Sequence, residues 1–127
     1  LAAYFMGSAV FMNNGKLEFS KKQLPPEAQF FPVNGIQCMD VNKDGHPDLL
    51  LAGNDYSTEV ETGRNDAGIG LILLGNGTGD FKAVTVTESG FYVPGDVKCL
   101  ESINIGGKAC FMAGKNKENI QVIKPVE

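Results

Sequence analysis

Residues 40–48 place oxygen-bearing side chains at alternate positions of one short stretch, which restricts the backbone there to a tightly wound loop. Asp40, Asn42, Asp44 and Asp48 occupy positions 1, 3, 5 and 9, Gly45 stands at position 6, and His46 offers its backbone carbonyl at position 7. Calcium binds several such oxygens, and glycine permits the sharp reversal that lets them point inward. The spacing therefore predicts a calcium loop. A metal-free turn is the alternative, because Asp, Asn and Gly are also common in ordinary turns.

The residues after this loop decide between a helix and a strand. A helix–loop–helix calcium site has a bidentate Glu at position 12 and continues into a helix. Here position 12 is Leu51 and position 8 is Pro47, which excludes that type of site. Residues 49–52 are a short apolar run closed by Gly53 and Asn54, which is typical of a buried strand. We therefore expect the loop to join two strands.

Two stretches of the chain resemble a known repeat. One is residues 40–51, and the other reads Gly-Leu-Ile-Leu-Leu-Gly-Asn-Gly-Thr-Gly-Asp-Phe at residues 70–81. They look like the FG-GAP or VCBS-type repeat of integrin-like β-propellers in bacterial surface and secreted proteins, and the resemblance covers residues 36–81. It implies four-stranded blades with calcium in the loop between the first two strands, and an extracellular, cell-surface or periplasmic location.

Composition narrows the class of protein. The chain has 127 residues, 43% of them hydrophobic, 16 Gly and a net charge of −4, with short apolar runs between Gly, Asn and Asp. These values are typical of a globular all-β chain. The mild acidity and the absence of a basic stripe argue against nucleic acid or an anionic membrane as partner. The sequence also lacks an apolar run of about 18 residues that would predict a membrane span.

The three cysteines, Cys38, Cys99 and Cys110, fall within strand-like runs. We expect them to be small buried hydrophobic residues, because unpaired cysteine is among the most buried residue types. A disulfide is the alternative. A metal site is disfavoured, because no Cys has a second Cys or His at ligand spacing.

The apolar pattern predicts short strands throughout the chain. Asn13-Asn14-Gly15 separates two of them and is typical of a hairpin turn. Pro25 and Pro26 predict a surface connection between two sheets. The expected strands are residues 3–6, 9–12, 17–20, 36–41, 49–52, 71–74 and 81–85, with a last one at residues 119–124.

A long polar stretch at residues 54–70 has no apolar period, and loops of that length are often functional. It contains Tyr56, Glu59, Glu61, Arg64 and Asp66, which together offer a polar contact surface. A solvated loop between two strands is the alternative interpretation.

An internal repeat suggests the architecture. A gapless shift of 61 residues aligns Leu50 with Phe111 and Gly45 with Gly106. The repeat predicts a complete blade at residues 31–87, preceded by a partial blade at 1–30 and followed by a degenerate partial blade at 88–127. The expected fold is therefore a partial β-propeller of about two and a half blades. In the last unit the ligand positions become Glu101, Ile103, Ile105 and Ala109, so we expect no cation there and an ordinary hairpin at Gly106-Gly107.

We count about ten strands, three in the first unit, four in the second and three in the last, which is fewer than the four blades of four strands that a closed propeller needs. We therefore expect the remaining blades to lie in a longer natural chain that extends upstream, or the chain to self-associate through its open blade edges.

Two functions follow from these observations. The first is a non-catalytic binding or adhesion module for a protein or glycan, with calcium in a structural role, because the loop would saturate its cation with protein oxygens. The alternative is a carbohydrate-active enzyme, a polysaccharide lyase or hydrolase, that uses Glu59, Glu61 and Asp66 as acid and base. The single His46 belongs to the loop, which leaves no histidine for a Ser/His/Asp arrangement.

Overall fold

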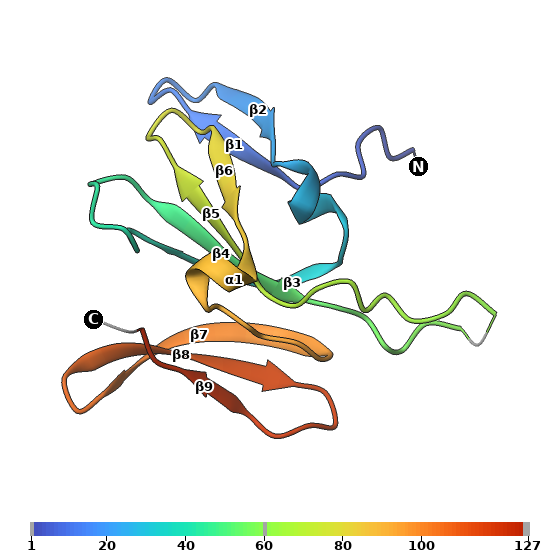
Figure 1. Cartoon of the computed structure of the whole chain (residues 1–127). Coiled ribbons are helices and arrows are strands. Elements are labelled where there is room, and N and C mark those ends of the chain that lie inside the picture. The colour runs from blue at the N-terminus through green and yellow to red at the C-terminus, as the bar shows by residue number, and fades with distance from the viewer. Residues whose placement is uncertain (1, 60, 126–127) are drawn as a thin grey trace.

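The computed structural model describes residues 2–59 and 61–125 and contains three antiparallel sheets (Figure 1). The first sheet pairs β1 (Ala9–Asn13) with β2 (Phe19–Gln23). The central sheet has the order β3 (Val33–Met39), β4 (Asp48–Gly53), β5 (Leu71–Gly75) and β6 (Phe81–Val84). The last sheet has the order β7 (Val97–Ile105), β8 (Lys108–Lys115) and β9 (Gln121–Ile123). The expectation of an all-β chain of antiparallel sheets is confirmed.

Helical structure in the described residues is limited to two single turns that connect successive sheets. A 3-10 turn, Pro26–Gln29, links β2 to β3, and α1 (Val86–Ser89) links β6 to β7. Thr85 and Glu88 form a capping box at the start of α1, which satisfies backbone N–H groups that the short helix leaves free. Neither helix is long or apolar enough to cross a membrane.

The sheets are stacked face to face in series, with the four-stranded sheet in the middle (Figure 1). Successive residues of a strand point to opposite faces. Leu51 and Leu73 therefore pack with Val10 of the first sheet, while Leu50 and Ile72 pack against the last sheet. Residues of the last sheet that complete this second cluster are Val97, Leu100, Phe111 and Ala113. Because both faces of β4 are covered, residues 49–52 form a continuous apolar run rather than an alternating one.

The strand registers show that the sheets repeat one pattern, but not with the gapless shift of 61 residues. The β3–β4 hairpin has a bulge at Val33/Gly35, and the β7–β8 hairpin has one at Val97/Cys99. When the two bulges are matched, each residue of β7 corresponds to the residue of β3 that lies 64 positions earlier in the sequence. The Val33↔Gly53 pair then matches Val97↔Lys115, which gives an offset of 62 for the second strands.

The expected gapless repeat is therefore wrong. The β7–β8 hairpin is two residues shorter than its counterpart, because the offset falls from 64 to 62 across it. It closes in a two-residue turn at Gly106 and Gly107, as expected for a loop without the cation ligands. In this register Asn104, rather than Glu101, corresponds to Asp40, and Gly35, rather than Cys38, corresponds to Cys99.

Two predicted strands of the first sheet differ in the structure. Residues 3–6 form no strand, and their Tyr4 and Met6 side chains are exposed. The strand expected at residues 17–20 begins later, at Phe19, because Leu17 has a φ of 64° and belongs to the turn. The first sheet therefore has two strands, and the described residues contain nine in total rather than about ten.

The cysteines are all free, but only one of the three is buried. Cys110 lies in the interior as expected, whereas Cys38 and Cys99 are exposed. Cys38 belongs to β3, and the two-stranded first sheet has no strand that covers β3 at this place. The expectation of three buried thiols is therefore wrong for Cys38 and Cys99.

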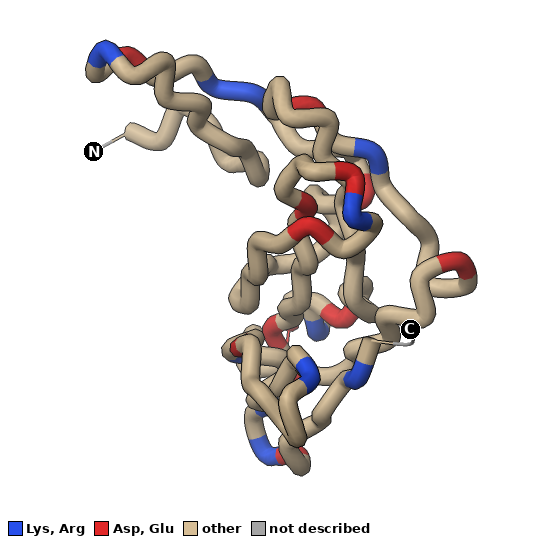
Figure 2. The backbone as a smooth tube through the Cα atoms, turned by 90° about the vertical axis from the view of Figure 1, so that its left-hand side faces the viewer, with Lys and Arg blue, Asp and Glu red and all other residues tan. Residues whose placement is uncertain are grey.

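Charged residues of both signs are interspersed along the backbone (Figure 2). Apart from the consecutive pair Lys21-Lys22, the Lys and Arg residues are separated from one another along the chain, whose net charge is −4.

Candidate metal centre

The loop between β3 and β4 holds all of the predicted ligands in a series of nested turns. The Asp40 carboxylate accepts hydrogen bonds from the backbone N–H groups of Asp44 (3.1 Å) and Gly45 (2.8 Å). Asn42 Oδ1 accepts from the Asp44 N–H (3.0 Å), and Asp44 Oδ1 accepts from the His46 N–H (2.8 Å). Gly45 has a φ of 88°, which reverses the chain where the sequence predicts a turn.

Asp48 fixes the loop to the body of the sheet. Its side chain is fully buried, with Oδ2 accepting from the Val41 N–H (2.9 Å) and Oδ1 from the Gly75 N–H (2.8 Å). Gly75 ends β5, so the loop is tied to the turn between β5 and β6. A Cβ atom on Gly75 would lie 2.2 Å from the Pro47 carbonyl oxygen, which shows how closely the two segments approach.

His46 reinforces the same contact through its side chain. A Cβ atom on Gly77 would lie 2.5 Å from His46 Nδ1, so the imidazole ring rests on the β5–β6 turn. The imidazole ring therefore faces the β5–β6 turn.

The donor chemistry of this loop fits calcium. Each carboxylate oxygen carries two lone pairs, so one backbone hydrogen bond leaves a second site for a cation. Hydrogen bonds from the Asn42 amide and from the His46 N–H lower the pKa of Asp44, which keeps this exposed carboxylate ionised. Three carboxylates and one amide oxygen along nine residues match the preference of calcium for oxygen ligands.

The carboxylates are nevertheless engaged with the loop's own amides. No three His, Cys, Asp or Glu side chains in residues 2–59 and 61–125 are grouped so that they could hold a metal ion. Calcium binding by Asp40, Asn42, Asp44, the His46 carbonyl and Asp48 therefore stays a prediction that the donor set supports.

The polar stretch after β4 is an ordered arm rather than an unstructured loop (Figure 1). Asp55 and Asn65 form an antiparallel pair through two backbone hydrogen bonds of 3.0 Å. The Arg64 guanidinium lies 4.9 Å from the centroid of the Tyr56 ring, and the Thr58 hydroxyl donates to the Gly63 carbonyl. These cross-links make residues 55–59 and 61–65 the two sides of a projecting arm.

Asn54 anchors the base of this arm inside the protein. It is fully buried, and its side-chain nitrogen donates to the carbonyl oxygens of Gly68 (2.7 Å) and Gly95 (2.9 Å). Its side-chain oxygen accepts from the Gly68 N–H (2.8 Å). Asn54 thus joins both ends of the arm to the segment that leads into β7.

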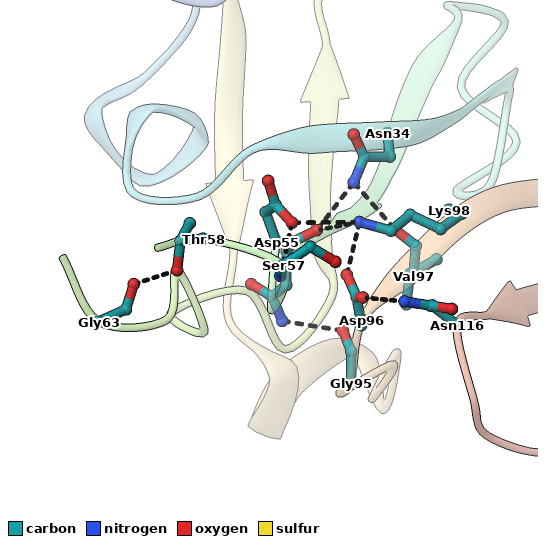
Figure 3. A network of polar contacts seen from close by, with 11 residues as sticks. Asn34, Asp55, Ser57, Thr58, Gly63, Gly95, Asp96, Val97, Lys98 and Asn116 are labelled. Carbon is teal, nitrogen blue, oxygen red and sulfur yellow. Dashed lines mark hydrogen bonds and ion pairs between the residues drawn. The ribbon is translucent and has the colours of Figure 1, made fainter. Parts of the chain in front are cut away.

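Lys98 forms an ion-pair network at the same place (Figure 3). Its Nζ atom lies 2.7 Å from Asp96 Oδ1 and 3.6 Å from Asp55 Oδ1. Burial works to raise the pKa of Asp96, but hydrogen bonds from Lys98 and Asn116 outweigh it and lower this pKa. The hydrogen bond to Asp96 raises the pKa of Lys98. Sequence reasoning missed this network, because residues about 40 positions apart carry no local signal of pairing.

The carboxylates considered for catalysis lie on the arm. The side chains of Glu59, Glu61 and Asp66 are all exposed. Catalysis by these residues stays a hypothesis.

Comparisons with protein-family models, with curated proteins and with solved structures found no match.

Proposed function

We propose that this chain is a calcium-stabilised part of a β-propeller that acts as a non-catalytic binding or adhesion module for a protein or glycan outside the cytoplasm. The observation that carries the proposal is the joint presence of an oxygen-rich loop and of sheets stacked in series with a common strand register. Serial stacking of similar antiparallel sheets is how propeller blades are arranged.

The proposed metal site and the proposed ligand-binding arm lie at opposite ends of β4. The calcium loop precedes β4 and the arm follows it, so the two lie at opposite ends of the central sheet (Figure 1). The arm is exposed, is fixed at its base, and carries Tyr56 and Arg64, residue types that are enriched at binding hot spots. Under the proposal, calcium holds one end of the sheet while the arm contacts the ligand at the other.

Calorimetric titration of calcium into chelator-treated protein tests the metal site. We expect one calcium per chain with a dissociation constant of roughly 10⁻⁵ to 10⁻³ M, the range of extracellular modules. Calcium should also raise the melting temperature, because a ligand that binds only the folded state stabilises it. Asp44→Ala should abolish both effects.

Asp80→Ala is the matched control. Asp80 is an exposed aspartate on the neighbouring β5–β6 turn, and it lies outside the predicted ligand set. This variant should retain calcium binding. Absence of a binding signal at millimolar calcium in the unmodified chain would refute the metal site.

A further inference from the structure

Both end sheets of the stack carry an outward face with exposed apolar side chains, and no other sheet of the described residues packs on it. In the first sheet Val10 points into the cluster beneath it, so Phe11 points outward by strand alternation. Phe11 and Phe19 are 65% and 62% exposed. Lys21 pairs with Phe11 across the sheet and lies 3.6 Å from the centroid of the Phe5 ring. We call Phe11, Phe19 and Lys21 the leading face.

The last sheet has a corresponding surface on its far side. Phe111 and Ala113 are buried against the central sheet, so Met112 between them points away from it. Met112 pairs with Glu101 on one side and with Val122 on the other, which places all three on one face. Val122 is 46% exposed. We call Glu101, Met112 and Val122 the trailing face; Ile103 and Ile105 extend it along β7.

The strand registers identify what each of these faces fits. The Asn13↔Phe19 pair of the first sheet corresponds to the Gly75↔Phe81 pair of the central sheet, an offset of 62. Phe11 and Phe19 therefore correspond to Leu73 and Phe81, two residues of the central sheet that pack toward the sheet before it.

The same comparison applies to the trailing face. Met112 corresponds to Leu50 through the offset of 62 between β4 and β8. Val122 corresponds to Ile72, because the Leu50↔Ile72 pair matches the Met112↔Val122 pair. Leu50 and Ile72 are the residues on which the following sheet packs. The leading face is thus the counterpart of the surface that the central sheet turns to the first sheet, and the trailing face is the counterpart of the surface that it turns to the last sheet.

We propose that copies of this chain associate head to tail, with the leading face of one copy packed on the trailing face of the next. The leading face carries Lys21, and the trailing face carries Glu101 beside Met112, with Lys108 farther along at the hairpin end opposite Ile105. Lys21 and Glu101 have opposite signs, which favours contact between unlike faces over contact between two leading faces. Such an interface is heterologous, so a copy bound at one face still offers its other face. The association requires no calcium.

Two single variants, alone and mixed, test this geometry. Phe11→Asp places a charge on the leading face, and Val122→Lys places a charge on the trailing face; both positions are exposed. We expect the unmodified chain to form dimers and larger species as concentration rises in sedimentation velocity. Each variant alone should be monomeric, with association weakened at least about tenfold, because a charge is placed in an apolar contact.

An equimolar mixture of the two variants should form dimers and nothing larger. The intact leading face of the Val122→Lys chain can bind the intact trailing face of the Phe11→Asp chain, and the pair is then capped at both ends. Leu17→Asp is the control, because Leu17 is an apolar residue 91% exposed in the β1–β2 turn and outside both faces. It should associate like the unmodified chain.

Three results would overturn the proposal. One is an unmodified chain that stays monomeric at high concentration; another is a mixture that stays monomeric. A third is a Val122→Lys chain that still dimerises, which would indicate contact between two leading faces. If a variant fails to fold by circular dichroism, the charge reversals Lys21→Glu and Glu101→Lys replace it. Each should weaken association alone, and the mixture should again form capped dimers.

Discussion

Small residues set the distances between segments of this protein. Gly75 ends β5 at the point where its N–H donates to the buried Asp48 carboxylate, and its Cα lies against the Pro47 carbonyl. Only a residue without a side chain fits this position. The predicted calcium loop is therefore held against the β5–β6 turn by close backbone contact as well as by the Asp48 hydrogen bonds.

Gly75→Ala should destabilise the fold by about 1–3 kcal/mol, because the added methyl group would force the loop and the turn apart. Gly15→Ala is the comparison, since its Cβ atom would meet nothing within 4 Å and its φ of 79° costs only about 1 kcal/mol. Urea denaturation of both variants measures the difference. Equal losses of unfolding free energy would show that the loop and turn separate without cost.

The base of the arm is held by a network of hydrogen bonds and ion pairs between three separate segments of the chain. Asn54 and Asp55 follow β4, Asp96 and Lys98 flank the first residue of β7, and Asn116 follows β8. Asp96 is 1% exposed, and its carboxylate oxygens lie 2.7 Å from Lys98 Nζ and 3.1 Å from the Asn116 side-chain nitrogen. A buried carboxylate that loses its cation is left without compensation for its lost hydration.

Lys98→Met should therefore lower the unfolding free energy at pH 7. The loss should be smaller than that for a fully buried pair, because the Lys98 side chain is 43% exposed and water screens part of the interaction. Combining it with Asp96→Asn should recover part of the loss, because the unpaired charge is then absent. Urea denaturation of the three variants provides the measurement.

The pH dependence of this network has a defined sign. The pKa of Asp96 is lowered from 3.8, so its stabilising effect is complete above pH 3.8 and is lost as pH falls through the lowered value. The pKa of Lys98 is raised from 10.5, so its effect is complete below pH 10.5 and is lost as pH rises through the raised value. The stability difference between the unmodified chain and the double variant should therefore be constant between these limits. A difference that changes with pH near 7 would contradict this assignment.

Local patterns in the sequence predicted the hairpins and the central sheet well, because apolar runs and turn residues report on neighbouring positions. They failed where the outcome depends on a distant partner. Residues 3–6 have the composition of a strand, yet no neighbouring strand pairs with them in the structure. The offset between repeats was missed because a hairpin can lose two residues without disturbing the apolar pattern on either side.

In the whole molecule, the central sheet packs against another sheet on each of its two faces. The central sheet is covered on both faces, whereas each end sheet is covered on one. Large exposed apolar surfaces of this kind usually mark sites of association. The stack of sheets therefore has two chemically different ends, the leading face on the first sheet and the trailing face on the last.

Thiol reactivity should report on this association. Cys99 is exposed on the side of β7 that carries Glu101, so head-to-tail packing should slow its reaction with a thiol reagent. Cys38 is exposed on β3 of the central sheet, outside both faces, and serves as the internal control. At low concentration the two thiols should react at similar rates, and at high concentration only Cys99 should become slow. Mass spectrometry of labelled peptides distinguishes them, and equal protection of both would contradict the proposed contact.

The position of β4 between the metal loop and the arm limits how a cation can influence ligand binding. A strand of six residues is about 20 Å long, whereas the Debye length at physiological ionic strength is about 8 Å. A charge at the loop is therefore screened from anything that approaches the arm. Any effect of calcium on ligand binding at the arm must therefore be transmitted through β4 and its neighbouring strands, as a change in their rigidity. Changes in salt concentration should leave that effect largely intact.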